Sequence, residues 1–194
     1  MGMTEHTPHA TALLVYASTH GHTAKIAARI ARAMGEAGVD TDVREVRAAK
    51  DADPAAYDAV IVAGSLHSEH HQPELADWVV AHREALEARP TVFCSVSLSA
   101  AEDTPESHAA TQRCIDAFCE KTGWSPSRTE RIAGCLQYRE YDFFTRQLMR
   151  MLMKKWGHET DISRDHDYTD WDALDVLGAE IADVAATRAG VSSA

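Results

Sequence analysis

An apolar strand that runs directly into a glycine-bearing turn and then into a helix is the feature that most constrains this chain. Residues 13–17 are apolar, Ser18 to Thr23 form the turn, and a helical pattern starts at Thr23. A helix start leaves backbone N–H groups unpaired and carries the positive end of the helix dipole, which stabilises an anion by about 0.3–1 kcal/mol. The hydroxyl groups of Ser18, Thr19 and Thr23 add donors. The stretch therefore predicts an α/β fold with an anion site at its first strand–helix junction.

The composition of the turn narrows the kind of anion. It has neither the Gly-Lys-Ser/Thr ending of a nucleoside-triphosphate loop nor the spaced glycines of a dinucleotide fingerprint. Gly21 is expected to let the backbone approach the ligand closely, because glycine has no Cβ. A phosphate monoester fits best. The residues assigned to this site are Ser18, Thr19, His20, Gly21, His22 and Thr23.

Strand-like and helix-like patterns alternate along the rest of the chain. Residues 58–65 and 91–98 are continuous runs typical of strands covered on both faces, whereas a more polar strand around 39–46 is expected near a sheet edge. A fifth strand is expected over 131–138. Helices are expected to follow, with start signals at Thr23, Pro73, Thr104 and Thr169. This alternation predicts a doubly wound, five-stranded parallel sheet.

Length and charge limit the class of protein. A chain of 194 residues suits a single domain, expected over 12–188 with flexible ends at 1–11 and 189–194. The net charge of -11 argues against a nucleic-acid partner and requires that any anionic ligand meet a local basic patch. The polar N-terminal residues and the lack of an apolar run of about 20 residues predict a cytoplasmic location.

The cysteines and the clustered histidines are not expected to form disulfides or a metal site. The sequence contains no Cys-x-x-Cys pair, so we expect reduced, mostly buried thiols. The four cysteines are Cys94, Cys114, Cys119 and Cys135. We interpret His67, His70 and His71 as solvated loop histidines, because no second cluster would complete a metal coordination shell. No metal site is expected.

A basic and apolar segment, about 139–168, interrupts the alternation before the last helix, where a short connection would suffice. Arg146, Arg150 and Lys154 recur at every fourth position, which places them on one face of a helix. Such a helix can lie on an anionic membrane surface. The alternative is that its basic residues form a solvated face while its Met and Phe side chains pack on the sheet.

Several of these stretches resemble known families. Three strand ends, 18–23, 64–67 and 95–98, are similar to the FMN-binding loops of flavodoxin-like proteins. Three further stretches, 132–138, 157–161 and 168–171, are similar to the menaquinone-dependent protoporphyrinogen IX dehydrogenases. The resemblance covers about residues 12–185. It implies a flavodoxin-like fold with a helical insert before the last helix.

The resemblance implies FMN as the cofactor, with its phosphate on the first turn and its ring at the ends of the first, third and fourth strands. The additional flavin-binding residues that it implies are Gly64, Ser65, Leu66, His67, Ser95, Val96, Ser97 and Leu98. The flavin would supply the redox chemistry, so no catalytic side chain is expected. Flavodoxins commonly have Thr at the position of His20, which leaves one phosphate contact to the backbone or to the imidazole.

The implied activity is oxidation of protoporphyrinogen IX to protoporphyrin IX in haem biosynthesis, with electrons passed to a quinone. Arg139, Arg146 and Arg150 are candidate partners for the propionates, and Tyr138 is expected either to flank the flavin or substrate or to pack in the core. The insert, including Lys154, would hold the protein at the inner face of the cell membrane. Two alternatives stay open: a flavodoxin-like electron carrier, favoured by the acidic surface, and an FMN-dependent NAD(P)H:quinone reductase.

Overall fold

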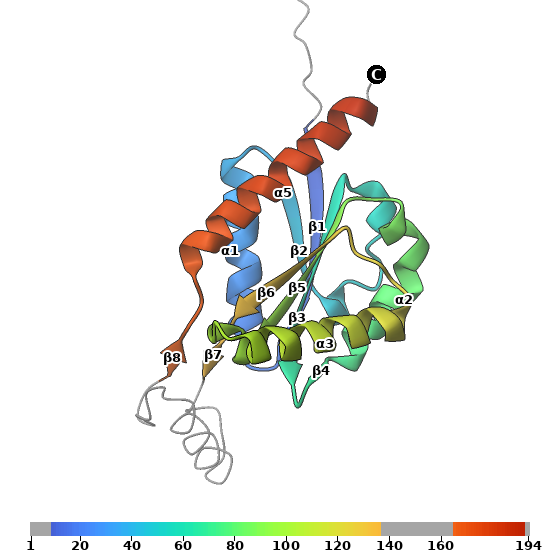
Figure 1. Cartoon of the computed structure of the whole chain (residues 1–194). Coiled ribbons are helices and arrows are strands. Elements are labelled where there is room, and N and C mark those ends of the chain that lie inside the picture. Colours follow the sequence, from blue (N-terminus) through green and yellow to red (C-terminus); the bar gives the residue numbers. More distant parts are fainter. Residues whose placement is uncertain (1–8, 137–164, 193–194) are drawn as a thin grey trace, which may run out of the picture.

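The computed structural model describes residues 9–136 and 165–192, which form a parallel sheet with helices on both faces (Figure 1). Five parallel strands stand in the order β2-β1-β3-β5-β6. Their bounds are Thr11–Ala17 for β1, Asp40–Glu45 for β2, Ala59–His67 for β3, Thr91–Ser97 for β5 and Arg128–Ala133 for β6. The doubly wound, five-stranded parallel sheet expected from the sequence is confirmed, and the polar strand β2 lies at an edge as expected.

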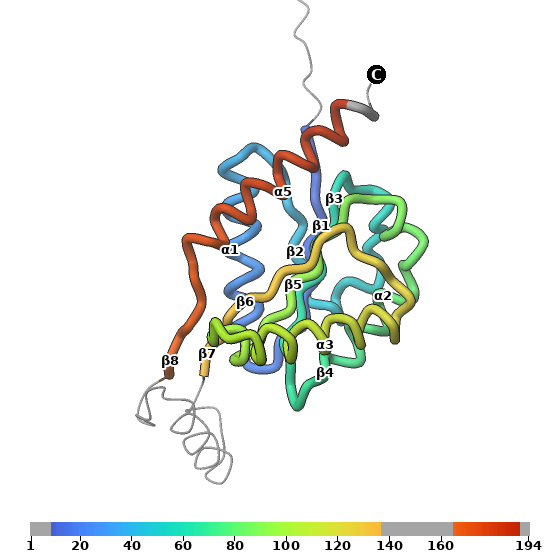
Figure 2. Tube along the Cα trace, in the orientation of Figure 1, coloured from blue at the N-terminus to red at the C-terminus, as the bar shows by residue number. Residues whose placement is uncertain are grey.

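Helices cover both faces of the sheet, as Figures 1 and 2 show. On one face lie α1 (His22–Glu36) and α5 (Trp171–Ser192), and on the other lie α2 (Pro73–Glu87) and α3 (Pro105–Thr122). Short 3-10 turns connect elements at Val46–Ala48 (η1), Pro54–Ala56 (η2) and Ser99–Ala101 (η3).

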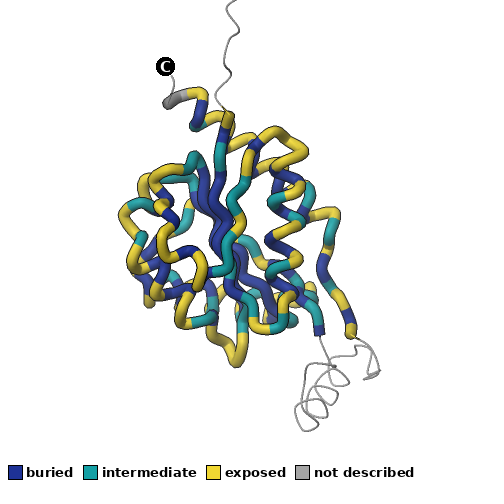
Figure 3. Tube along the Cα trace, turned by 180° about the vertical axis from the view of Figure 1, so that it is seen from behind, coloured by how far each residue is buried: buried dark blue, intermediate teal, exposed yellow. Residues whose placement is uncertain are grey.

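The strands bury both of their faces, because successive side chains point to opposite sides. Leu14 and Ile61 pack toward α1 and α5, whereas Leu13 and Val62 pack toward α2 and α3. Figure 3 shows the buried strands between helices whose outer surfaces are exposed. The two apolar layers fix the strand ends in space and so fix the loops that follow them.

The helix starts agree with the sequence signals except at the last helix. Pro73 and Pro105 are the first residues of α2 and α3, and the Thr104 hydroxyl accepts a hydrogen bond from the Ser107 N–H at 3.2 Å. The last helix starts at Trp171 rather than at Thr169, because the Asp170 side chain caps it by accepting from the Ala173 N–H at 3.0 Å. It runs to Ser192, past the expected domain end at 188.

The segment after residue 65, in which the sequence predicted loop histidines at 67, 70 and 71, forms a hairpin. Strand β3 continues to His67, and β4 (His70–His71) pairs with it in antiparallel orientation. The turn between them places Ser68 and Glu69 at φ values of 49° and 65°. Two consecutive residues with positive φ are typical of a two-residue hairpin turn, which usually contains Asn or Gly. This sequence lacks that signal.

The fifth strand lies earlier in the sequence than the range 131–138 that the pattern predicts. The structure has β6 at Arg128–Ala133, and the following β7 (Cys135–Leu136) leaves the sheet to pair with β8 (His166–Asp167) in antiparallel orientation. The chain segments on either side of residues 137–164 are therefore held side by side.

Candidate functional site

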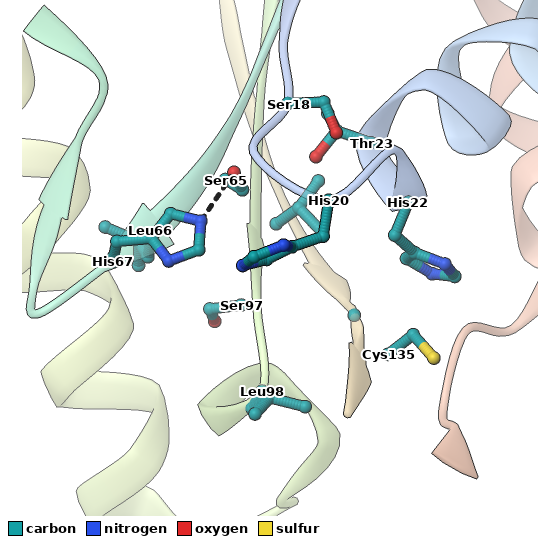
Figure 4. Close-up of a pocket in the computed structure, with 12 residues that line it drawn as sticks. Ser18, His20, His22, Thr23, Ser65, Leu66, His67, Ser97, Leu98 and Cys135 are labelled. Carbon is teal, nitrogen blue, oxygen red and sulfur yellow. Dashed lines mark hydrogen bonds between the residues drawn. The ribbon is translucent and has the colours of Figure 1, made fainter. Parts of the chain in front are cut away.

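A cleft lies where β1, β3 and β5 end (Figure 4). Its wall is built from the turn after β1, the start of α1, the ends of β3 and β5, and the link from β6 to β7. The residues that line it are Ser18, His20, His22, Thr23, Ser65, Leu66, His67, Val96, Ser97, Leu98, Gly134 and Cys135. All but the last two were assigned to a cofactor site from the sequence.

The first turn presents the amino end of α1 to this cleft. Gly21 is the N-cap residue with φ 82°, and no side chain caps the helix there. Gly21 adopts a left-handed backbone that L side chains rarely adopt, and a Cβ there would meet no protein atom within 4 Å. The first-turn N–H groups of α1 thus have no side-chain cap competing with an anionic ligand.

The polar groups of the cleft suit an anion. Hydroxyl groups come from Ser18, Thr23, Ser65 and Ser97, and imidazoles come from three histidines. The lining residues include no carboxylate, whose charge would repel a phosphate. The donor set therefore fits a phosphate monoester bound through hydroxyl, imidazole and backbone N–H groups.

Two residues assigned to the cofactor from the sequence, Gly64 and Ser95, contact the hairpin and α2. A Cβ on Gly64 would lie 2.6 Å from Leu75 Cδ2 and 3.3 Å from His71 Cδ2, so glycine is required there by α2 and β4. Ser95 is fully buried, and its hydroxyl oxygen lies 3.0 Å from His71 Nε2. Neither lines the cleft. Thr19 also lies outside it and accepts a hydrogen bond from the Gln72 amide at 3.4 Å.

The expectation of solvated loop histidines is wrong for His71. This side chain packs against the rings of Phe93 and Phe118, each with a centroid separation of 5.0 Å. Burial lowers the pKa of His71 to about 4, so the ring is neutral near pH 7. By contrast, His67 and His70 are exposed. Of the three histidines, only His71 is therefore part of the buried core.

A chain of hydrogen bonds ties the start of α1 to the start of α5. His22 Nε2 lies 2.7 Å from the Thr169 hydroxyl, which donates its only proton to the Ala133 carbonyl at 2.8 Å. Nε2 must therefore carry the proton and donate it to Thr169. Burial lowers the pKa of His22, an effect partly opposed by the Asp167 carboxylate, 3.6 Å from Nε2. His22 is thus held in one tautomer, with its Nε2 facing away from the phosphate turn and toward residues 167–169.

A second pair of histidines faces each other inside the cleft. His20 lies in the first turn and His67 at the end of β3, with ring centroids 5.8 Å apart in an edge-to-face arrangement (Figure 4). His67 Nε2 also lies 3.4 Å from the Ser65 hydroxyl. Burial, and to a lesser degree the His20 ring, lower the pKa of His67.

Comparisons with known proteins account for this arrangement. Residues 13–163 match the family model described as "Flavodoxin domain". The chain is 30% identical over 173 residues to protoporphyrinogen IX dehydrogenase [quinone] of Escherichia coli (strain K12), covering 88% of this chain and 93% of the relative. It is 33% identical over 171 residues to the Leishmania major protein of that name, covering 88% and 74%. The chain belongs to this flavodoxin-like family of dehydrogenases.

The fold of this family member is that of the flavodoxins. Oxidised flavodoxin 1 from Bacillus cereus superposes with a TM-score of 0.55 at 14% identity, covering 90% of this chain and 98% of that one. The family resemblance read from the three loops and from the stretches around residues 132–138 and 168–171 is confirmed. Membership of this family indicates a flavin cofactor. The ends of β1, β3 and β5 and the hydroxyl groups that follow them meet at the cleft.

The sequence assignment missed Gly134 and Cys135 as residues of the cleft wall in this family member. The Gly134 N–H donates to the Ser97 carbonyl at 3.0 Å, which brings the link after β6 against the end of β5. Burial raises the pKa of Cys135 to about 11, so its thiol stays protonated near pH 7. Both residues lie in the run 132–138, which carries part of the family resemblance. That resemblance is the sequence feature from which both residues could have been predicted.

The cysteines are free thiols, as expected, but only Cys94 is buried, whereas Cys114, Cys119 and Cys135 are partly exposed. In residues 9–136 and 165–192 no cluster of three or more His, Cys, Asp or Glu side chains forms a metal-binding group. Over the same residues, no helix is both long and apolar enough to cross a membrane. The residues assigned to substrate or membrane contact, Tyr138, Arg139, Arg146, Arg150 and Lys154, lie outside the described residues.

Proposed function

We propose that this protein is an FMN-dependent protoporphyrinogen IX dehydrogenase of haem biosynthesis that passes electrons to a quinone. The observation that carries the proposal is the pair of relatives named for this activity, which are 30% and 33% identical over 88% of the chain. The cleft supports it independently, because its donors suit a phosphate monoester at a helix start.

The cleft residues divide by the part of FMN that they would hold. Ser18, His20 and Thr23, together with the N–H groups at the start of α1, would bind the phosphate. The ends of β3 and β5, with Leu66 and Leu98 as apolar contacts, would position the ring. FMN supplies the hydride chemistry when bound. The protein side chains orient it and limit its contact with water.

The undescribed segment 137–164 is the proposed site of substrate and membrane contact. The strands that flank this segment, β7 and β8, pair with each other, and Cys135 of β7 lines the cleft wall. We propose that Tyr138 flanks the flavin or substrate and that Arg139, Arg146 and Arg150 pair with the propionates of the porphyrinogen. With Lys154, these cations would also favour peripheral contact with an anionic membrane surface.

The direct test is anaerobic mixing of FMN-loaded protein with protoporphyrinogen IX, followed by the visible absorption of the flavin. The expected result is bleaching on mixing and recovery of the absorption on addition of a quinone. Protoporphyrin IX, which cannot donate hydrogen, serves as the control ligand. A flavin that dithionite bleaches but protoporphyrinogen leaves unchanged contradicts the proposed substrate and favours the electron carrier. Bleaching by a reduced nicotinamide alone favours the quinone reductase.

Membrane contact has its own test. Arg146→Glu combined with Arg150→Glu is expected to reduce co-sedimentation with anionic vesicles, because each basic residue near such a surface contributes about 1 kcal/mol. Arg83→Glu combined with Arg113→Glu, at exposed positions of α2 and α3, is the matched charge control. Equal sedimentation of the double variant and the control contradicts a role for the insert in membrane contact.

A further inference from the structure

One side chain joins the turn after β1 to the end of β3. The backbone ladder between these strands ends at the pair Ala17 and Gly64. Beyond that pair, the turn and the strand end form different parts of the cleft wall (Figure 4). The Gln72 amide nitrogen donates to the Ser65 hydroxyl at 2.5 Å and to the Thr19 hydroxyl at 3.4 Å. The amide therefore bridges two segments that the ladder no longer holds together.

The position of Gln72 in the fold is one where a shorter side chain is usual. Gln72 is the N-cap residue of α2, but its side chain does not cap the helix. N-cap positions favour Ser, Thr, Asp and Asn, whose short side chains accept from the first-turn N–H groups. The Gln72 side chain instead reaches the last pair of the ladder, because a Cβ on Gly64 would lie 3.6 Å from Gln72 Oε1. The helix thus lacks a side-chain cap, and the bridge takes its place.

The amide group is buried here at a cost to stability. Gln72 Oε1 is buried and has no hydrogen-bond partner among residues 9–136 and 165–192. A buried carbonyl oxygen without a donor is unfavourable, because folding removes it from water and supplies no replacement. A Met side chain has a similar length and would avoid this cost. The hydrogen bonds to the two segments are therefore what the amide supplies and an apolar side chain would not.

Each end of the bridge adjoins a different part of the proposed cofactor site. Thr19 lies outside the cleft, between Ser18 and His20, which are assigned to the phosphate. Ser65 lines the cleft and precedes Leu66, which is assigned to the ring. The bridge therefore links the segment proposed for one end of FMN to the segment proposed for the other.

We propose that Gln72 is a positioning residue that holds these two segments at the spacing that FMN requires. The inference rests on the proposed function in that FMN is taken as the ligand. Because the ring and the phosphate belong to one molecule, binding of one raises the effective concentration of the other at its own part of the site. That gain is greatest when the spacing is fixed before binding. Loss of the bridge is therefore expected to weaken the binding of FMN more than that of riboflavin, which lacks the phosphate.

The test measures binding of FMN and of riboflavin to the full-length apoprotein by quenching of flavin fluorescence. Gln72→Met removes both hydrogen bonds and keeps the length of the side chain. It is expected to weaken FMN binding by about tenfold and to change riboflavin binding little.

Urea unfolding of the same apoprotein separates positioning from packing. The midpoint of Gln72→Met is expected to equal or exceed that of the parent protein, because the unpaired buried oxygen is removed. Thr19 is exposed and Ser65 partly exposed, so both hydroxyls can bind water in place of the amide. A residue that served only the packing of the hairpin would lower the midpoint when replaced.

Thr19→Val tests the other end of the bridge. Thr19 lies outside the cleft, so this substitution removes the acceptor for Gln72 and no side chain of the cleft wall. It is expected to weaken FMN binding selectively, by less than Gln72→Met does, because its hydrogen bond is the longer one. The double variant is expected to lose no more than Gln72→Met alone, because both changes break one bridge. Gln112→Met, at an exposed position of α3, is the matched control and is expected to bind both flavins as the parent does.

The outcomes separate this inference from the proposed function. Equal weakening of FMN and riboflavin by Gln72→Met, no weakening of either, a lower urea midpoint, or additive losses in the double variant overturns the inference. None of these affects the proposed function, which depends on reduction of bound FMN by protoporphyrinogen IX. Failure of the folded parent protein to bind FMN overturns both. A loss specific to FMN, without loss of stability and without additivity, supports the inference.

Discussion

At the scale of single residues, hydrogen bonds link the start of α1 to a distant part of the sequence. The Thr169 hydroxyl joins His22 at the first residue of α1 to the Ala133 carbonyl at the end of β6. The indole N–H of Trp171 holds Asp167 at 3.2 Å in the same group. The stretch 168–171, which the sequence could mark only by resemblance, thus has a physical role beside the cleft.

Thr169→Val tests that role. The substitution removes the hydroxyl and leaves the His22 N–H and the Ala133 carbonyl without this partner, so we expect a loss of about 1–3 kcal/mol in the free energy of unfolding and weaker FMN binding. Thr187→Val, at an exposed position of α5, is the matched control and is expected to change both quantities little. Urea unfolding and FMN fluorescence quenching measure the two effects, and equal behaviour of the variants contradicts the assignment.

The buried His71 gives a pH prediction. Its pKa is about 4 in the folded protein and near 6.5 in the unfolded chain, so the unfolded state binds the proton more readily. Its contribution to stability is therefore complete above about pH 6.5 and lost as the pH falls toward about 4, by at most about 3 kcal/mol. His71→Gln, which does not titrate, is expected to flatten this part of the urea-unfolding profile. An unchanged acid dependence contradicts the prediction.

The sequence pattern identified ten of the residues that line the cleft, but it did not show the packing contacts of Gly64 and Ser95. The turn after β1 is local, so its hydroxyls and helix start were visible as a pattern. Gly64 and Ser95 are governed by Leu75 and His71, which come from α2 and the hairpin and are brought close only by the fold. Such long-range contacts leave no periodic signal in the sequence.

At the scale of elements, the close crossing of α1 and α5 sets where the turn between β1 and α1 lies. A Cβ on Gly178 would lie 2.6 Å from Ala33 Cβ and 2.8 Å from the Ile30 carbonyl oxygen. The backbone of α5 therefore packs directly on α1. The five strands, their parallel arrangement and most helix starts followed from the apolar runs and the helix-start signals. The hairpin at Ser68 and Glu69 did not, because neither residue is typical of positive φ.

Gly178→Ala tests the helix crossing. The methyl group would force the helices apart, and overpacking of this kind costs about 1–3 kcal/mol, more than the higher helix propensity of Ala returns. Gly190→Ala lies in the same helix with no atom within 4 Å of the new Cβ, so it is expected to leave stability unchanged or slightly raise it. Thermal unfolding compares the two, and equal effects contradict a close crossing at Gly178.

At the scale of the whole molecule, the fold brings together a flavodoxin-like cleft and the two strands that flank residues 137–164. Strand β7 pairs with β8, and Cys135 of β7 lines the cleft wall. An electron carrier with this fold needs only the cleft and a docking surface. The sequence between these two strands is basic and apolar, which favours an enzyme with an amphipathic substrate over a carrier.

Anaerobic reduction of the FMN-loaded protein by protoporphyrinogen IX tests this account most directly. We predict that the visible absorption of the flavin is lost on mixing, returns when a quinone is added, and is unaffected by protoporphyrin IX. A flavin that stays oxidised with protoporphyrinogen IX, under conditions in which dithionite reduces it fully, would contradict the proposed activity.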